Sequence, residues 1–449
     1  MDPLAEALID ARVRTLSLVA DLDDDQWMGP RLANVNPLRW ELGHLAWFQE
    51  YWTLRRAGAD SRVPGADALF DSTKVAHDTR WDLPLPGRAL VLGYLDDTLS
   101  RSLTALEADP AGRYFHWLAL GHEDMHGEAF TYTRQTLAYP RPLLPAAPGS
   151  AKGGNAGGWP GPTAHPWPSP GPTAHPWPSP GPTTHAGPWP GDAEVPGARF
   201  LLGAREGVPQ VQQEPHVFDN EKWAHPVDVA SFRIARAPVT NAEYAGFVEA
   251  GGYRDRRFWS DEGWLWRAGA QAGRPVYWEP GFRERRYDRV RPISPHTPVI
   301  HVSWHEAEAF CRWAGRRLPS EAEWELAAGT PDKRPFPWGD APPDVRHANL
   351  DGRAGDPVDV AANPEGDSAY GCRQMIGNVW EWTASDFAPY PGFAVDPYKE
   401  YSAPWFATPH KVLRGGCWAT RGRLLRNTWR NFYPPDRRDV LAGFRTCAL

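Results

Sequence analysis

The sequence predicts an α+β protein of two domains, a helical bundle followed by a domain of short strands, short helices and much irregular chain. Residues 1–140 hold long segments whose apolar residues recur at helical spacing, whereas residues 193–449 alternate short apolar runs with turns. Between them, residues 141–192 are rich in proline and glycine, which favour neither helix nor sheet. A length of 449 residues also exceeds what one hydrophobic core usually organises.

Four segments of the first domain carry the helical pattern. They span residues 3–22, 36–56, 87–108 and 113–140. In the second segment, Asn36 is the expected N-cap and Pro37 the first helical residue. Four helices of this length, with one wide break between the second and the third, predict a four-helix bundle. The polar loop at residues 71–86 is long enough to carry function.

The linker at 141–192 consists largely of a repeated decapeptide. "GPTAHPWPSP" occurs at 161–170 and again at 171–180, and an altered third copy follows. His165, His175 and His185 recur with the repeat. The composition predicts a disordered or polyproline spacer. Both a metal-binding tract and plain repeat expansion would account for the histidines.

The second domain shows two clear helical stretches, at residues 238–253 and 302–328. Within the latter, Ser320 begins "SEAE", a capping box ahead of an apolar run. The rest is rich in tryptophan and glycine. The chain has 24 Trp, which could wall a polar pocket or simply fill a core that has few strands.

Charge and hydropathy argue against nucleic acid and membranes as partners. A net charge of −7 argues against a nucleic-acid surface, and no run of about 18 apolar residues predicts a membrane span. The start of the chain lacks the pattern of an export signal, so the expected location is the cytoplasm and the expected partners are small molecules. The four cysteines form no CxxC pair and are expected to be reduced and mostly buried. They are Cys311, Cys372, Cys417 and Cys447.

Three histidines of the first domain form a candidate metal site. His122 and His126, in "GHEDMHGEAF", are four residues apart and share one helix face. His44, in "ELGHLAWF", lies near the apolar face of the second segment, and facing helices of a bundle commonly supply metal ligands. Three neutral imidazoles would leave open positions on a divalent metal. Surface or capped histidines are the alternative, and imidazole alone does not choose among zinc, iron, copper and nickel.

Longer motifs resemble a known family. "NPLRWELGHLAWF" and "HEDMHGEAFTYTRQTLAYP" are similar to the DinB-type bundle of the ergothioneine-type sulfoxide synthases. "PVTNAEYAGFV", "GNVWEWT", "VLRGGCW" and "AGFRTC" are similar to the formylglycine-generating-enzyme domain of those enzymes, a sulfatase-modifying-factor fold related to C-type lectins. The resemblance implies iron(II) held by His44, His122 and His126. It also implies dioxygen-dependent coupling of a sulfur or selenium donor to the imidazole of hercynine (trimethylhistidine), in a pocket between the domains.

The resemblance also suggests substrate contacts. Asn431 and Phe432, in "RNFYPPDRRD", match positions around the substrate imidazole, and Tyr390, in "SDFAPYPGF", matches a tyrosine that contacts substrate. Phe387 stands where the mycobacterial-type enzymes have an active-site tyrosine, and Tyr433 where they have the acidic residue for γ-glutamylcysteine. Both departures weigh against that donor. They make Tyr433 the candidate proton donor, with core packing as the alternative for Phe387.

The donor itself is predicted from the two ends of the chain. "NVNPLRWELGHLAWFQEYW" and "RNTWRNFYPPDRRDV" look closest to the selenoneine synthase branch, which joins a selenosugar to hercynine. A sulfoxide synthase that uses cysteine or γ-glutamylcysteine is the alternative. In "VAHDTRWDLP", Arg80 is expected to contact an anion or hydroxyl of the donor, unless it caps a helix end.

Three other functions compete with this interpretation. A formylglycine-generating oxidase needs two cysteines after the "GG" turn, but Thr420 and Leu425 occupy those positions and Cys417 comes too early. A DinB-type, metal-dependent thiol transferase would not need the large second domain. A non-catalytic binding protein would not need three convergent histidines.

Deleting residues 161–190 is expected to leave the melting temperature and the turnover rate nearly unchanged, because proline- and glycine-rich repeats cannot bury a core. Calorimetry and initial-rate assays on the full chain and the deletion variant measure both. A Gly/Ser replacement of equal length is the control for linker length. A large loss in the deletion variant alone would point to length, and a loss in both variants to the repeats themselves.

Overall fold

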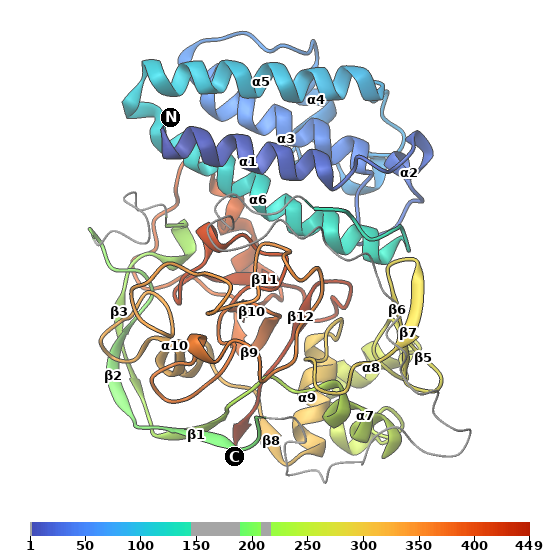
Figure 1. The fold of residues 1–449 in the computed structure, drawn as a ribbon, viewed down its shortest axis with the longest axis vertical. Helices are drawn as coiled ribbons and strands as arrows, with labels where there is room; N and C mark the ends of the chain where they lie inside the picture. Colours follow the sequence, from blue (N-terminus) through green and yellow to red (C-terminus); the bar gives the residue numbers. More distant parts are fainter. Residues whose placement is uncertain (1, 145–188, 208–216) are drawn as a thin grey trace, which may run out of the picture.

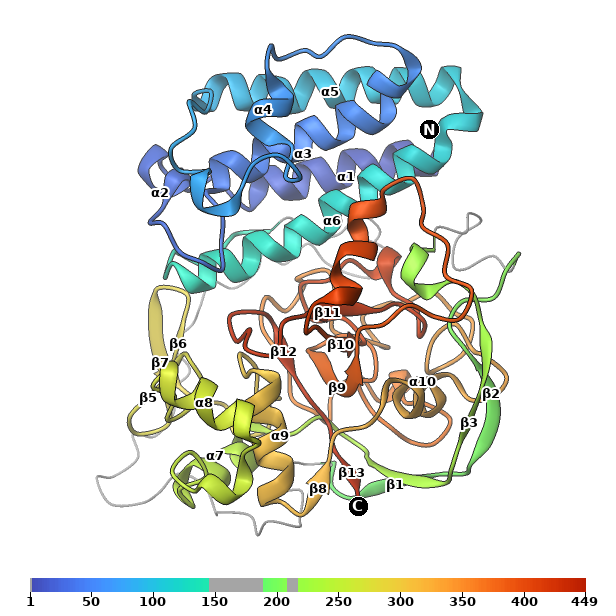
Figure 2. The same cartoon turned by 180° about the vertical axis from the view of Figure 1, so that it is seen from behind.

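The computed structural model describes residues 2–144, 189–207 and 217–449. The repeats and their three histidines lie outside these residues. A helical domain sits across one end of a larger mixed domain, and helix α6 runs along the boundary between them in both views (Figures 1 and 2). The predicted fold class is confirmed.

The first domain is a bundle of the predicted helices. They are α1 (Pro3–Ser17), α3 (Leu38–Thr53), α5 (Arg88–Ala108) and α6 (Arg113–Thr136), with α2 (Asp24–Met28) and α4 (Ala66–Phe70) in the connections. Helix α3 is buried along most of its length and packs against α5 and α6. The predicted N-cap is wrong. Pro37 occupies that position, and the Asn36 amide instead donates to Glu41 Oε1 at 2.8 Å.

Four small sheets organise the described part of the second domain. The sheet β11-β10-β9-β12 comprises Asn431–Tyr433, Lys411–Arg414, Trp380–Asp386 and Ala442–Gly443. The sheet β1-β4-β13-β8 comprises Asp192–Val195, Phe232–Ala235, Cys447–Ala448 and Arg316–Arg317. The remaining sheets are the two-stranded β2-β3 (Ala198–Leu202, His225–Val229) and the three-stranded β5-β6-β7 (Trp278–Glu279, Arg283–Arg286, Arg289–Pro292). In the first sheet β10 runs antiparallel to both neighbours and pairs Val412 with Phe432.

Three of the four α-helices described in the second domain begin at capping boxes. The four helices are α7 (Asn241–Glu249), α8 (Asp261–Gly269), α9 (Trp304–Trp313) and α10 (Glu321–Gly329). Ser320 caps α10 as predicted, and Thr240 and Ser303 cap α7 and α9 in the same way. Trp324, Trp380, Trp382 and Trp418 are almost fully buried. Much of the tryptophan content therefore fills the core.

All four cysteines are free and buried, as predicted. Cys417 packs in the main core of the second domain, and the Thr420 hydroxyl lies 3.3 Å from its sulfur. Within the described parts of the chain, no helix is long and apolar enough to cross a membrane.

A stripe along α6 binds the two domains together. Its residues are spaced three or four apart and so share one helix face. Met125 Sδ lies 3.7 Å from the Tyr401 hydroxyl, and Gly121 leaves room for Phe218. Glu128 accepts hydrogen bonds from Trp380 Nε1 at 2.7 Å and from Thr420 Oγ1 at 2.6 Å. The next residue of the stripe, Tyr132, packs on the core of the second domain.

Candidate metal centre at the domain boundary

The structure brings the three predicted histidines together. One ring nitrogen from each of His44, His122 and His126 lies within 4.8 Å of the others. Nε2 of His44 and Nε2 of His122 are 3.2 Å apart. His44 comes from α3 and the other two from α6, one residue along from the interdomain stripe. The cluster therefore lies between α3 and α6, beside the boundary with the second domain.

Burial keeps two of these imidazoles neutral. Removal from water lowers the pKa of His44 to about 3 and that of His122 well below its usual value, and the nearby His126 adds to both shifts. A neutral imidazole offers the lone pair that a metal needs. The donor set therefore fits a divalent metal.

The orientation of the His44 ring is fixed by a hydrogen bond on the side away from the cluster. Its Nδ1 lies 2.8 Å from the Phe70 carbonyl, so Nδ1 carries the proton and the Nε2 lone pair faces the cluster. Gly43 allows this approach, because a Cβ at that position would lie 2.1 Å from the Phe70 ring. On the other side, Phe48 stacks on His122 with ring centroids 3.6 Å apart.

A carboxylate stands behind the third histidine. Glu41 Oε2 lies 3.7 Å from His126 Nδ1, and neither atom has a hydrogen-bond partner within the described chain. Glu41 Oε1 is held by Asn36, whose Oδ1 in turn accepts from Arg80 Nη1 at 2.6 Å. A carboxylate at this position commonly orients a metal-bound imidazole. Glu41 is the carboxylate nearest to His126 Nδ1 that can take this role.

Arg80 lies within this supporting network. Its guanidinium carbon is 3.7 Å from the centre of the Trp40 ring, and Trp40 stacks on His44 at 4.9 Å. Its Nη2 donates to the Val75 carbonyl at 3.3 Å. Arg80 is 9% exposed. Its predicted contact with a donor molecule stays a prediction, because its described partners all belong to the bundle.

Replacing Glu41 with glutamine is expected to weaken metal binding about 10–100-fold, since the neutral amide orients His126 less strongly. Metal titration by calorimetry on the metal-free protein measures the dissociation constant. Glu50→Gln is the control, because Glu50 is equally buried on α3 but bonds Tyr94 and Ser61. Equal affinity in wild type and Glu41→Gln would remove Glu41 from the metal site.

The second domain reaches the cluster through Tyr398, which the sequence analysis missed. Its ring centroid lies 6.4 Å from His122 and 5.0 Å from Phe48. Tyr401, 6.3 Å from Tyr398, lies 6.3 Å from Phe432 on β11. A line of aromatic rings therefore joins the histidines to the strand that carries the predicted substrate residues.

Tyr433 lies at the domain boundary. The Arg437 guanidinium is 5.2 Å from the ring of Tyr433 and 5.8 Å from that of Tyr132 on α6. Burial, followed by the nearby Tyr132 and Glu128, raises the pKa of Tyr433 well above its usual value. The phenol therefore keeps its proton. Asn431, also on β11, is half-buried, and its Oδ1 accepts from the Phe432 amide at 2.8 Å.

Phe387 and Tyr390 are more deeply buried in the second domain than Asn431 and Tyr433. Phe387 is buried and stacks on Phe432 with centroids 3.9 Å apart. Tyr390 is buried beside Gly203, and the Arg430 guanidinium lies 4.1 Å from its ring. This placement agrees with core packing for Phe387. It leaves substrate contact by Tyr390 as a prediction.

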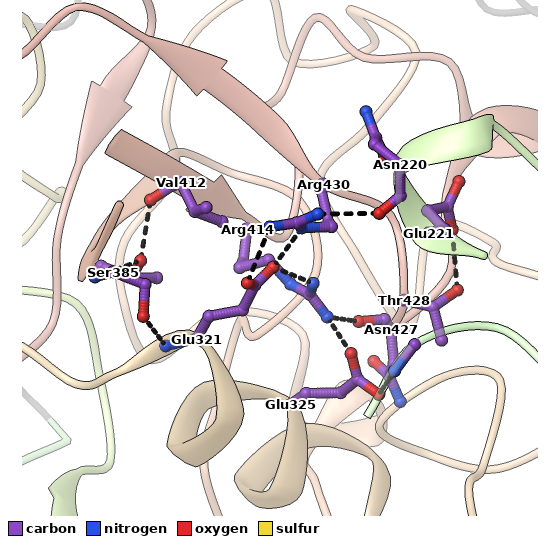
Figure 3. Close-up of polar contacts among 12 residues, drawn as sticks. Asn220, Glu221, Glu321, Glu325, Ser385, Val412, Arg414, Asn427, Thr428 and Arg430 are labelled. Carbon is purple, nitrogen blue, oxygen red and sulfur yellow. Dashed lines mark hydrogen bonds and ion pairs between the residues drawn. The ribbon is translucent and has the colours of Figure 1, made fainter. Parts of the chain in front are cut away.

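Buried charges hold these segments in place (Figure 3). Arg430 pairs with Glu321 at 2.7 Å and donates to the carbonyls of Asn220 and Ala388 at 2.7 and 3.1 Å. Arg414 of β10 pairs with the same Glu321 at 2.8 Å. Buried ion pairs of this kind fix geometry more than they add stability. Arg430 thus ties the chain at 387–390 to β11.

Comparison with known proteins matches both domains. The DinB superfamily matches residues 7–134, and the sulfatase-modifying factor enzyme 1-like domain matches residues 181–448. A protein named hercynine oxygenase from Mycolicibacterium thermoresistibile is 40% identical over 459 residues, which cover 98% of this chain and 94% of that protein. The chain belongs to the hercynine oxygenase family. The hercynine oxygenase of Mycobacterium tuberculosis is 38% identical and covers 99% of this chain and 98% of its own length.

The match to formylglycine-generating enzymes is shorter. The enzyme of that name from Thermomonospora curvata is 32% identical and covers 57% of this chain and 92% of its own length. Hercynine oxygenases use iron(II), and the histidine cluster provides the nitrogen donors that iron(II) accepts. Thr420 stands at one of the two positions where a formylglycine-generating oxidase needs a cysteine, and here its hydroxyl donates a hydrogen bond to Glu128 of the bundle.

Proposed function

We propose that this chain is an iron(II)- and dioxygen-dependent enzyme that joins a thiol donor to the imidazole ring of hercynine. The observation that carries the proposal is the cluster of His44, His122 and His126 beside the domain boundary. The family relatives, named hercynine oxygenases, support the substrate. They also favour a sulfur donor over the selenosugar that the ends of the sequence suggest.

The proposed reaction balances as thiol plus hercynine plus dioxygen giving the sulfoxide and water. The bound iron supplies the activation of dioxygen and the redox change. His44, His122 and His126 would hold it through three ring nitrogens. Phe48 and Tyr398 cover His122 and keep water away from it. The trimethylammonium group of hercynine prefers aromatic faces, which Tyr398, Tyr401 and Phe432 present.

Among thiols, we propose that cysteine is a better donor than γ-glutamylcysteine. The position expected to hold an acidic contact to the latter's amine is Tyr433, a neutral phenol. A selenosugar is the second candidate, and the same observation favours it. An uncharged sugar needs hydrogen bonds and no ion pair, and a protonated phenol can donate one.

One experiment tests both candidates. Protein loaded anaerobically with iron(II) and hercynine is offered cysteine, γ-glutamylcysteine and a selenosugar in parallel, and mass spectrometry identifies the products after dioxygen is added. We expect the coupled sulfur product, with the highest kcat/KM for cysteine. A higher kcat/KM for the selenosugar would replace the first candidate with the second. The absence of coupling with every donor would overturn the proposal.

A further inference from the structure

A row of aromatic rings connects the histidine cluster to the protein surface along α3. His44, Trp47 and Tyr51 are three and four residues apart and therefore share one helix face. The rings of His44 and Trp47 have centroids 5.8 Å apart at 20°, and those of Trp47 and Tyr51 are 5.3 Å apart at 27°. Trp47 is 6% exposed, whereas Tyr51 is 37% exposed. Two ring-to-ring steps separate a histidine of the cluster from solvent.

A second row begins at His122 and ends at the same tyrosine. Tyr398 lies 6.4 Å from His122, Trp52 lies 6.1 Å from Tyr398, and Tyr51 lies 5.2 Å from Trp52. Tyr51 is therefore the common exposed end of both rows. Tryptophan and tyrosine are the aromatic side chains that lose an electron most easily, and close ring contact allows the electron to move between them.

The surroundings of Trp47 favour the loss of an electron. Its Nε1 donates a hydrogen bond to Asp67 Oδ1 at 2.7 Å. The ion pair with Arg55 lowers the pKa of Asp67 to about 2, so this group remains a carboxylate. A negative charge beside the indole stabilises the cation that remains when an electron leaves.

We propose that Trp47, Trp52 and Tyr51 carry oxidising equivalents away from the metal centre to the surface. This inference rests on the proposed function, because it needs a centre oxidised by dioxygen. When no substrate is present to react, Trp47, or Trp52 through Tyr398, would give up one electron toward an iron held by the three histidines after its reaction with dioxygen. Tyr51 then gives one electron to the oxidised tryptophan and releases its phenolic proton to water. A soluble thiol then gives a hydrogen atom to the Tyr51 radical, and two thiyl radicals combine to a disulfide.

Tyr51→Phe tests the route, since it removes the outlet of both rows and keeps the ring that packs. Iron-loaded protein is mixed with dioxygen in the absence of hercynine, frozen rapidly and examined by electron paramagnetic resonance. Trypsin peptides are then searched for oxidised Trp47 and Trp52 by mass spectrometry. In wild type we expect a tyrosyl radical. In Tyr51→Phe we expect this signal to be lost and oxidation of the two tryptophans to increase. In a separate assay with hercynine and a thiol, we expect Tyr51→Phe to complete several-fold fewer turnovers before inactivation at an unchanged initial rate.

Tyr370→Phe is the matched control, because Tyr370 is a partly buried tyrosine of the second domain. It should behave as wild type. The route is overturned if wild type forms no tyrosyl radical, or if Tyr51→Phe matches wild type in radical signal and tryptophan oxidation. Failure of the proposed function is recognised separately, as the absence of coupled product from wild type with hercynine and any donor.

Discussion

Replacing His122 with alanine is expected to remove the iron and the coupling activity together. Nε2 of His122 lies 3.2 Å from Nε2 of His44, so the two lone pairs converge on one position. Loss of a supporting residue alone typically costs about 10–100-fold in metal affinity or activity, and loss of a ligand should cost more. Elemental analysis gives the iron content, and mass spectrometry of the coupled product gives the rate.

His116→Gln is the control for this experiment. His116 is a buried histidine of the same helix, but its ring nitrogens contact the carbonyls of Gly112 and Ser102 at 3.2 and 3.0 Å. This variant should keep its iron. Melting temperatures separate misfolding from loss of a ligand, and added imidazole should restore part of the iron to His122→Ala alone. Full iron content in His122→Ala would contradict the assignment.

The histidine cluster could be predicted because its signal is local. The spacing of His122 and His126 fixes a shared helix face, and the apolar residues around His44 place it inside the bundle. The helices were predictable for the same reason, since periodicity and capping residues act over one or two turns. The N-cap predicted at Asn36 was wrong because the Asn36 side-chain amide donates to Glu41 and its Oδ1 accepts from Arg80, which lies far along the chain.

The residues that the second domain places beside the histidine cluster could not be predicted in the same way. Tyr398 reaches His122 from a segment of irregular chain, and no local pattern fixes where such a segment lies. One further signal was available. Gly121, Met125, Glu128 and Tyr132 repeat at helical spacing beside the histidines, and this stripe faces the second domain. Motif similarity predicted Phe387 and Tyr390 at a substrate site. Both rings lie beside Arg430, which pairs with Glu321, and only the fold brings these residues together.

Tyr433→Phe is expected to lower kcat/KM about tenfold, which corresponds to the loss of one hydrogen bond worth about 1 kcal/mol or somewhat more. Burial raises the pKa of the phenol, so we expect it to stay protonated and able to donate, and we expect no loss of rate from its ionisation as pH rises through the ordinary tyrosine pKa. Steady-state assays with cysteine and with a selenosugar measure the effect.

Two variants show whether the hydroxyl of Tyr433 is specific. Tyr132→Phe removes the hydroxyl of the second tyrosine near Arg437 and should have a smaller effect. Phe387→Tyr should leave the rate largely intact, because that ring is buried against Phe432. An equal loss with both donors in Tyr433→Phe would indicate a proton donated to a step common to both. A loss confined to one donor would indicate a contact with that donor. An unchanged rate with both would exclude Tyr433 from the reaction and leave its hydroxyl a part of the domain boundary.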